Sequence, residues 1–347
     1  MDYVNYKVMC QLSIIVAAYN IEEYIDRCLY SIEPLSKHLD IEIIVINDGS
    51  TDRTEERIKH YIDRHQYVRL ITQDNQGLSA VRNRGIEIAT GDYVWFIDGD
   101  DYIDSAEFLR VFDYVSLGAL YDVICFGRLE DYGSKRIKNP VIRSFRKYET
   151  GRLYLNDSIS TGLYRTQVWD RLYRREFIMN HSIQFEEGLI YEDMLFSLQV
   201  FMDANSVAVI PVYPYYYIHY NPYSITKSIR SKDMDVLLFV DKSSRFIFEK
   251  NDMDEELIRS FNILIFTWVS SCLLNKYAYL SLYREDAKKI VEAVLMNEHF
   301  MQSVAYCRSH YCGMRKTLFA NILSFSPLLF RISIAFSLFL RRLFLHL

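Results

Sequence analysis

The first hundred residues alternate between short apolar runs and amphipathic segments, and this alternation limits the possible folds more than any other feature of the chain. Four runs of mostly apolar residues predict strands, over residues 12–18, 41–46, 67–71 and 93–97, and the first and the last of them are expected to be buried. The segments between them predict helices that start near Glu22, Asp52 and Leu78. Strands that alternate with helices in this way form a mainly parallel sheet covered by helices on both faces.

Two of the predicted helix starts have the spacing of capping boxes. Asn20 with Glu23, and Asp52 with Glu55, place a capping side chain three residues before an acidic one. We therefore expect Asn20 and Asp52 to cap the first two helices.

The loops that follow the strands carry most of the polar chemistry. In open α/β sheets, ligands bind at the carboxyl ends of the strands. Three of the four predicted strands end in loops with carboxylate or aromatic side chains, over residues 17–20, 47–52 and 98–101. Turn and helix-cap chemistry accounts for Asp52 but leaves Asp48 without a structural reason.

The loop Asp98-Gly99-Asp100-Asp101 is the most unusual of the three. Its three carboxylates repel one another, and no Lys or Arg lies nearby in sequence to compensate them. A divalent cation would resolve the repulsion with hard oxygen ligands, and Gly99 would let the backbone approach a diphosphate closely. A solvated acidic turn is the alternative. The buried strand just before the loop favours the metal site, and no EF-hand, GxGxxG or P-loop pattern occurs in the chain.

The charge of the chain is unevenly distributed. The net charge of −5 argues against a protein whose main ligand is the nucleic-acid backbone. Residues 299–347 contain six Lys or Arg and no Asp or Glu, which leaves 34 basic and 45 acidic residues, a net −11, in the rest. Six scattered cysteines without CxxC spacing, and the absence of a secretory signal, predict a reduced cytosolic setting.

Three successive segments of the chain carry a resemblance to a known family. LSIIVAAYNIEEYIDRCLYSI, EIIVINDGSTDRTEERI and NQGLSAVRNRGIEIATGDYVWFIDGDDYI resemble the successive motifs of family 2 inverting glycosyltransferases of the GT-A fold, over residues 11–104. The resemblance continues more weakly over residues 169–175, 191–193 and 217–226. It departs from the usual pattern at His219, where such proteins more often carry Arg, so the contacts of this position are left open.

The resemblance implies a donor site for a nucleotide-sugar across the strand ends. Ala17, Tyr19, Glu22 and Asp48 would hold the base and the ribose. Tyr19 would cover the ring, and Asp48 would accept a hydrogen bond from the base.

The same resemblance implies a metal cofactor. Asp98 would reach the ribose and stands as a second candidate ligand, while Asp100 would bind Mn²⁺ or Mg²⁺ bridging the two phosphates. Such a cation would stabilise the negative charge that develops on the departing diphosphate.

A base must also take the proton of the acceptor hydroxyl as that hydroxyl attacks the anomeric carbon. The Glu-Asp pair of the family corresponds to Glu192 and Asp193, and we assign Asp193 as the base. The alternative is that Asp193 caps the following helix. Arg82 and Arg84, in the predicted third helix, could contact the donor, but we interpret them as solvated helix charges, which is the more common case.

The basic, apolar tail over about 315–347 has three possible interpretations. It could pack as a terminal helix, span a membrane, or lie at a membrane surface with its cations on anionic lipid. Arg331 in the middle of the apolar stretch disfavours a span, and the scarcity of polar residues disfavours simple packing. An interfacial helix fits best.

The sequence thus predicts a GT-A glycosyltransferase domain over residues 1–225 and a helical C-terminal region over 226–347. We expect a metal-dependent hexosyl- or N-acetylhexosaminyltransferase, with a UDP-sugar as the favoured donor, that adds a single sugar to a saccharide or lipid-linked glycan in bacterial surface-polysaccharide synthesis. We expect it at the cytoplasmic face of the plasma membrane. A nucleotide-sugar-binding protein without transferase activity and a processive synthase are the alternatives.

Overall fold

The structure is a computed structural model that describes residues 11–115, 120–189, 191–221, 234–249, 254–274, 277, 280–282 and 284–325. The chain folds into two compact units. Unit 1 comprises Met1–Tyr154 with Leu163–Ser228, and unit 2 comprises Leu155–Gly162 with Ile229–Leu347. The predicted boundary near residue 225 lies outside the described residues.

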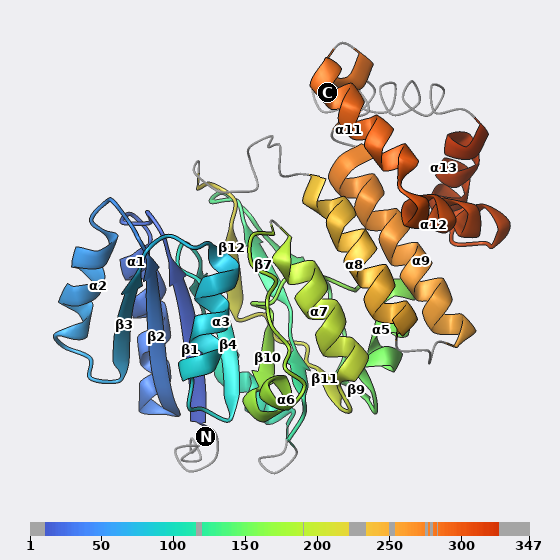
Figure 1. The fold of residues 1–347 in the computed structure, drawn as a ribbon. Helices are drawn as coiled ribbons and strands as arrows, with labels where there is room; N and C mark the ends of the chain where they lie inside the picture. Colours follow the sequence, from blue (N-terminus) through green and yellow to red (C-terminus); the bar gives the residue numbers. More distant parts are fainter. Residues whose placement is uncertain are drawn as a thin grey trace. The chain divides into compact units, whose positions relative to one another are not determined.

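Unit 1 is built on a sheet of eight described strands in the order β3-β2-β1-β4-β10-β6-β11-β9. The four strands predicted at the start of the chain are confirmed as β1 (Gln11–Ala18), β2 (Asp40–Asp48), β3 (Val68–Gln73) and β4 (Tyr93–Asp98), all parallel. Figure 1 shows these four strands side by side, with helix α3 (Leu78–Ile88) in front of them.

The other half of this sheet is mixed. Strand β10 (Arg171–Arg174) runs antiparallel to β4 and also to β6 (Val123–Cys125). Strand β11 (Val207–Val209) pairs parallel with β6 and antiparallel with β9 (Arg146–Tyr148). The parallel character predicted from the first hundred residues therefore holds for the half of the sheet formed by β1 to β4.

The helices between the strands cover the sheet with apolar faces. On α1 (Ile25–Ile32), the buried residues Ile25, Cys28, Leu29 and Ile32 recur at helical spacing. Helix α3 comes so close to β1 that a Cβ on Gly85 would lie 2.5 Å from Ile15 Cγ2. The remaining helical elements of unit 1 are η2 (Glu33–Lys37), α2 (Thr54–Ile62), α4 (Ser105–Leu109), η3 (Arg110–Asp113), α6 (Arg175–Asn180) and α7 (Glu192–Asp203), and α5 (Gly151–Ser160) runs from unit 1 into unit 2.

The expected caps of the first two helices are wrong in detail. Helix α1 begins after Tyr24, and α2 begins after Arg53; neither residue makes a side-chain capping bond. Asn20 instead accepts a hydrogen bond from the backbone N–H of Thr51 at 2.8 Å, across two loops. Asp52 does accept the N–H of Thr54 at 3.0 Å, at the start of α2. The side chain of Asn20, which local spacing predicts to cap α1, is thus used in a contact between the loops after β1 and β2.

A second, four-stranded sheet in the described part of unit 1 has the order β5-β12-β7-β8. It is formed by β5 (Tyr102–Ile103), β12 (Tyr215–Ile218), β7 (Arg128–Asp131) and β8 (Arg136–Asn139), and we call it the small sheet. Strands β7 and β8 pair antiparallel as a hairpin. Strand β5 follows directly on the Asp98–Asp101 loop, so the small sheet begins at the predicted site.

Aromatic side chains fill the core between these elements. Trp95 on β4 is fully buried, stacks on Phe108 with 4.3 Å between ring centroids, and donates Nε1–H to the carbonyl of Trp169 at 2.8 Å. Burying one such large apolar side chain stabilises the fold by about 1.5–3 kcal/mol. The core therefore anchors the carboxyl end of β4, where the acidic loop starts.

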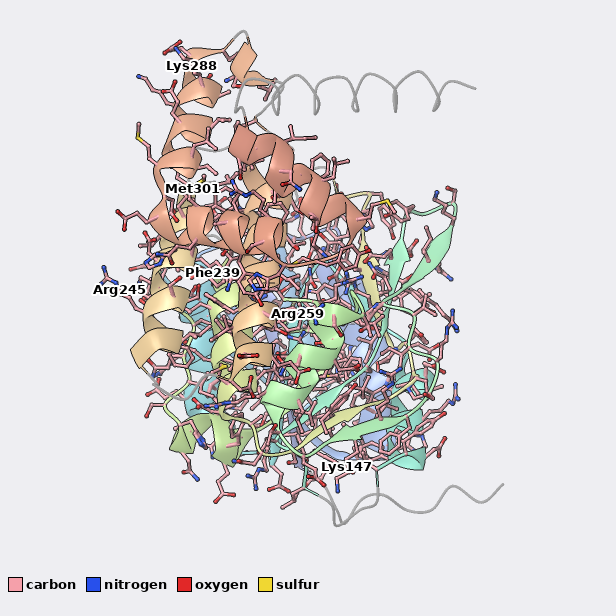
Figure 2. The ribbon with its side chains drawn as sticks, turned by 90° about the vertical axis from the view of Figure 1, so that its right-hand side faces the viewer. Lys147, Phe239, Arg245, Arg259, Lys288 and Met301 are labelled. Atoms are coloured by element: carbon pink, nitrogen blue, oxygen red, sulfur yellow. The ribbon has the colours of Figure 1, made fainter. Side chains whose placement is uncertain are left out.

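Unit 2 is helical in its described part. Its elements are α8 (Asp235–Glu249), α9 (Glu255–Val269), η6 (Ser270–Leu274), η7 (Leu280–Leu282), α11 (Glu285–Met296), α12 (Glu298–Ser309) and α13 (Met314–Phe325). Figure 2 shows Phe239, Arg259 and Met301 on α8, α9 and α12 within this unit, and Phe239 lies 4.9 Å from Trp268 between ring centroids.

One described helix, Glu255–Leu274, is long and apolar enough to cross a membrane by length and composition, and 56% of its apolar window is buried within the structure. A buried core helix passes the same test. Of the predicted interfacial tail over about 315–347, residues 315–325 belong to α13, and the part from 326 onward lies outside the described residues.

Candidate functional site

The loops after β1, β2 and β4 meet at one edge of the large sheet. Strand β1 lies between the other two, with Ala18 in register with Asn47 and Ala17 in register with Asp98. The carbonyl of Ala17 also accepts the backbone N–H of Gly99 at 2.9 Å. The structure therefore places Ala17, Tyr19, Asp48, Asp98 and Asp100 at the same strand ends, as the sequence predicts.

Side chains of the second loop hold the backbone of the first. Thr54 Oγ1 accepts the N–H of Ile21 at 2.8 Å, and Asp52 Oδ2 accepts the N–H of Glu22 at 3.0 Å. Next to these anchored residues, the Tyr19 side chain is 48% exposed. An exposed ring on a fixed backbone is suited to cover a flat ligand group.

Glu22 is bound by a neighbouring arginine. Its Oε2 accepts the backbone N–H of Arg53 at 2.9 Å and Arg53 Nε–H at 3.1 Å. These hydrogen bonds lower the pKa of Glu22 and keep it ionised. Its ligand role stays a prediction.

Asp48 has a structural role that the sequence did not predict. Its Oδ1 accepts hydrogen bonds from Gln73 Nε2 at 2.8 Å and from the backbone N–H of Gln76 at 3.0 Å, and its Oδ2 accepts that of Gly77 at 2.8 Å. The buried carboxylate thus shapes the turn that leads into α3. A carboxylate has about four acceptor positions, so a hydrogen bond to a base remains chemically open at Oδ2.

The carboxylates of the acidic loop have three different environments. Asp98 Oδ1 accepts Arg82 Nη2–H at 3.0 Å. Asp100 Oδ2 accepts Asn221 Nδ2–H at 2.8 Å. Asp101 is buried and accepts the Tyr215 hydroxyl at 2.6 Å together with the backbone N–H of Ile218 at 2.8 Å.

Burial raises the pKa of Asp100 and Asp101, and the charges of their acidic neighbours raise it further. The hydrogen bonds of Asp101 tie it to β12, so it is a structural side chain. Asp98 and Asp100 are left as the candidates for ligand chemistry.

The metal prediction can be compared with these donors. Among the described residues, no three His, Cys, Asp or Glu side chains group into a metal-binding cluster. Mg²⁺ in phosphate-binding sites is commonly held by one or two carboxylates, and substrate phosphates and water complete the shell. Asp98 and Asp100 each have one carboxylate oxygen engaged and one remaining. The donor set fits a cation that is completed by a bound diphosphate.

Arg82 is the central side chain of the site, and the interpretation of Arg82 as a solvated helix charge is wrong. It is 2% exposed. Its Nη2 binds Asp98 at 3.0 Å, and its Nη1 binds Glu192 at 2.8 Å and Asp193 at 2.5 Å. Arg84 does behave as predicted, because it is 47% exposed and pairs with Glu87 on the same helix.

This contact of Arg82 connects segments about one hundred residues apart. The N-terminal turn of α7 carries Glu192 and Asp193, and the end of β4 carries Asp98. One guanidinium therefore joins the acidic loop of the predicted donor site to the Glu-Asp pair of the predicted base. Local sequence could not show this, since Arg82 and Arg84 differ only in the direction that α3 turns them.

Asp193 does not cap α7 in the structure. The N-cap position is Tyr191, which has a φ of 87° and makes no side-chain capping bond, and Asp193 is turned toward Arg82 instead. A left-handed conformation at a tyrosine is costly, and strained residues of this kind cluster at functional sites.

Burial raises the pKa of Asp193 to about 8, and the charges of Glu192 and Asp98 add to the rise while Arg82 opposes it. The side chain keeps 19% exposure, so a substrate hydroxyl can reach it. A carboxylate with a raised pKa is a stronger base than a solvated one.

The weakly resembling segment around residue 219 folds over the acidic loop. His219 Nε2 lies 2.5 Å from Glu130 Oε2, and its ring stacks on Tyr132 with 4.1 Å between centroids. Asn221, two residues later, reaches Asp100. His219 is therefore engaged with the small sheet, and the loop contact at this end comes from Asn221, which the sequence did not single out.

Comparison with known proteins agrees with this geometry. The family model described as Glycosyl transferase family 2 matches residues 13–180. EpsJ and EpsH of Bacillus subtilis are both named as glycosyltransferases without a stated substrate. This chain is 35% identical to EpsJ over 65% of each protein and 32% identical to EpsH over 77% of each. It thus spans just under two thirds of EpsJ.

Solved structures show the same fold. Residues 1–349 of Staphylococcus aureus TarS match 94% of this chain and 90% of that chain with a TM-score of 0.70 and 19% identity. A complex of the same protein with UDP-GlcNAc matches with a TM-score of 0.68. The predicted α/β GT-A fold with a helical C-terminal region is confirmed. With more than three quarters of EpsH covered at 32% identity, this chain belongs to glycosyl transferase family 2.

Proposed function

We propose that this protein transfers one sugar from a UDP-sugar to a hydroxyl of a saccharide or lipid-linked glycan, with inversion at the anomeric carbon. The observation that carries the proposal is the bridge by Arg82, which holds Asp98 at the strand ends and Asp193 on α7 to one guanidinium. A donor lying across the strand ends would present its sugar toward Asp193. The UDP-GlcNAc complex of TarS, a protein of the same fold, supports the choice of a UDP-sugar.

Asp193 is the proposed general base. Its carboxylate takes the proton of the acceptor hydroxyl, the hydroxyl oxygen bonds to the anomeric carbon, and the bond from that carbon to the diphosphate breaks. UDP leaves with the bonding electron pair. A single displacement inverts the anomeric centre, so an α-linked donor gives a β-linked product.

Arg82 has a positioning role in this scheme. Its guanidinium orients Asp193 and, through its positive charge, keeps a fraction of that carboxylate ionised near neutral pH despite its burial. Glu192 binds the same nitrogen of Arg82 as Asp193 does, and we propose that it helps to hold the guanidinium in this orientation.

The donor would be held by residues of the three loops. Tyr19 covers the base, and Ala17, Glu22 and Asp48 lie beside it at the strand ends. Asp100, with Asp98, would hold Mn²⁺ or Mg²⁺, which would neutralise charge on the diphosphate as it departs.

An acceptor on a lipid carrier would place the enzyme at the cytoplasmic face of the membrane. The cations of the tail over about 315–347 support this location through their charge. A single transfer is favoured over processive synthesis, because the sequence lacks the Gln-x-x-Arg-Trp segment of such synthases.

The test is release of UDP from a panel of UDP-glucose, UDP-galactose and UDP-GlcNAc, with Mn²⁺ or with EDTA and without acceptor. We expect slow hydrolysis of at least one donor that depends on Mn²⁺ and is lost in Asp193→Asn. Glu187→Gln, which removes an exposed carboxylate shortly before α7, should hydrolyse the donor as wild type does. Donor binding without any turnover would support the non-enzymatic alternative and refute the proposal.

A further inference from the structure

The outer face of the small sheet carries a row of polar and aromatic side chains beside the proposed site. In the register of the four strands, Lys138 on β8 lies opposite Leu129 on β7, Leu129 opposite Tyr216 on β12, and Tyr216 opposite Tyr102 on β5. Side chains in register on neighbouring strands point to the same face. By the same alternation Arg136, two residues before Lys138, shares this face.

Tyrosine rings and cations are stacked on one another across this face. Tyr102 and Tyr216 stack with 4.6 Å between ring centroids. The guanidinium of Arg136 lies 5.1 Å from the centroid of Tyr216, and Lys138 Nζ lies 4.4 Å from that of Tyr213. Arg136 Nε pairs with Asp131 Oδ2 at 3.5 Å, and the Arg136 side chain is still 55% exposed, so part of its guanidinium is open to solvent.

A shallow pocket of about 400 Å³ lies on this face. Its lining includes Tyr30, Tyr102, Tyr216, Arg136 and Asp104. This volume is within the range of about 300–1,000 Å³ for small-molecule sites. Asp104 uses one carboxylate oxygen to cap α4 by accepting the N–H of Glu107 at 3.0 Å, which leaves the other for a ligand hydroxyl.

The pocket is connected to the acidic loop through Tyr102, which is part of its lining. Strand β5, which carries Tyr102, starts one residue after Asp101. The guanidinium of Arg27 lies 4.7 Å from the centroid of Tyr102, and its Nη2 donates to the carbonyl of Asp100 at 3.3 Å. Its Nη1 donates to the hydroxyl of Tyr220 at 2.6 Å. A chain bound in the pocket could therefore extend toward the reacting centre.

The segment that supplies the cations is strongly basic. Between Tyr132 and Tyr148 there are six Lys or Arg and no Asp or Glu, and all six are exposed. The buried Asp131 pairs with Arg136 at 3.5 Å and also accepts the Tyr102 hydroxyl at 2.6 Å and the backbone N–H of Gly133 at 2.8 Å, while the other five described cations of this segment are not bound by it. Protection of an edge strand explains charges on β8, but it does not explain the tyrosines and the pocket next to them.

We propose that this face is a binding site for an anionic saccharide chain, which holds the part of the acceptor that precedes the reacting sugar. Sugar C–H faces stack on Tyr102 and Tyr216. Phosphate or carboxylate groups of the chain bind Arg136 and Lys138, and a guanidinium matches either group with two parallel hydrogen bonds. The assignment of the chain to an acceptor rests on the proposed function, while the binding of the chain does not.

The experiment measures binding of the full chain to three probes of similar length: poly(glycerol phosphate), oligogalacturonate and a neutral maltooligosaccharide. We expect at least one anionic probe to bind and the neutral one to bind about tenfold more weakly. The double variant Arg136→Gln/Lys138→Gln should weaken anionic binding by about tenfold or more, since hydrogen bonds between charged groups are lost. Tyr216→Ala should weaken it as well.

The matched control is Arg143→Gln/Lys147→Gln. It removes the same charge from two exposed cations of the same basic segment, one of them on β9 in the other sheet, and Figure 2 labels Lys147. This control should retain binding within about threefold. Equal losses in the two double variants would indicate a general charge effect and overturn the proposal, as would failure of both anionic probes to bind.

Two further measurements separate this proposal from others. Vesicles containing anionic phosphatidylglycerol test a lipid surface; loss of vesicle binding in Arg136→Gln/Lys138→Gln without loss of glycan binding would overturn the proposal. Donor hydrolysis without acceptor should be unchanged in all these variants. If wild type hydrolyses no donor but still binds the anionic probe, the proposed function fails while the glycan site stands.

Discussion

Replacement of Arg82 by methionine tests the central contact of the site. The side chain is 2% exposed and makes ion pairs at 3.0, 2.8 and 2.5 Å with Asp98, Glu192 and Asp193. Methionine keeps an apolar stem of similar length in α3 but removes the only charge that these three carboxylates share in the described structure. Breaking a buried ion pair by removing one partner typically costs about 3–5 kcal/mol.

The exposure of the three carboxylates indicates how much free energy of unfolding Arg82→Met should lose. The three carboxylate side chains keep 25%, 12% and 19% exposure, so water can partly solvate them after the cation is lost. We therefore expect the low end of the range, about 3 kcal/mol. For a unit of this size, that loss lowers the melting temperature by about 6–12 °C.

The matched control is Arg84→Met on the same helix. Arg84 is 47% exposed and pairs with Glu87, which is itself 65% exposed, so its loss should change stability by less than about 0.5 kcal/mol. Thermal and urea unfolding of both variants, followed by circular dichroism, measure the difference.

The pH dependence separates charge from packing. Without Arg82, the carboxylates repel one another in their ionised forms, and protonation at lower pH removes the repulsion. The difference in free energy of unfolding between wild type and Arg82→Met should therefore become smaller as the pH is lowered from 8 to 5. A deficit that is independent of pH, or equal losses in the two variants, would refute the charge-bridge account.

Asp193→Asn should lower transfer about 10²- to 10⁴-fold, with the Kd for UDP within about twofold of wild type by calorimetry; wild-type turnover would remove Asp193 as the base. In wild type, the pH profile of kcat/KM should rise to a limb near pH 8, because the raised pKa of Asp193 leaves the base protonated below it; a limb near pH 4 would contradict this. The same raised pKa makes the contribution of Asp193 to stability greatest below pH 4 and lost as pH rises through about 8, so Asp193→Asn should not lower the melting temperature at pH 8. Asp100→Asn should weaken binding of UDP measured with Mn²⁺ and leave binding measured with EDTA unchanged; an equal loss in both would argue against a metal role. Gly99→Ala should destabilise unit 1 by about 1–3 kcal/mol, since its Cβ would lie 2.5 Å from Ile21 Cδ1 and 2.7 Å from the carbonyl oxygen of Ala17; wild-type unfolding in urea would show that this contact relaxes freely.

Local patterns were sufficient for the first half of the sheet. The four runs became β1 to β4. Strands β2 and β4 are buried along most of their length and are therefore apolar, whereas β3 is an edge strand in which only Val68 is buried. Parallel pairing brings the carboxyl ends of these strands to one edge of the sheet, so the polar loops that follow β1, β2 and β4 could be expected to meet there. Strand β10 could not be predicted in the same way, since Arg171–Arg174 is short and charged, and it joins the sheet only through its antiparallel partners β4 and β6.

The sequence alone determined which loops carry the carboxylates and, through its motifs, the family of the chain. The tertiary structure decided how each polar side chain is used. Arg82 and Arg84 are two residues apart with the same chemistry, yet one is buried among three carboxylates and the other is solvated. The physical reason is that a buried charge is stable only with its partners, and those partners come from α7, about 110 residues further along the chain.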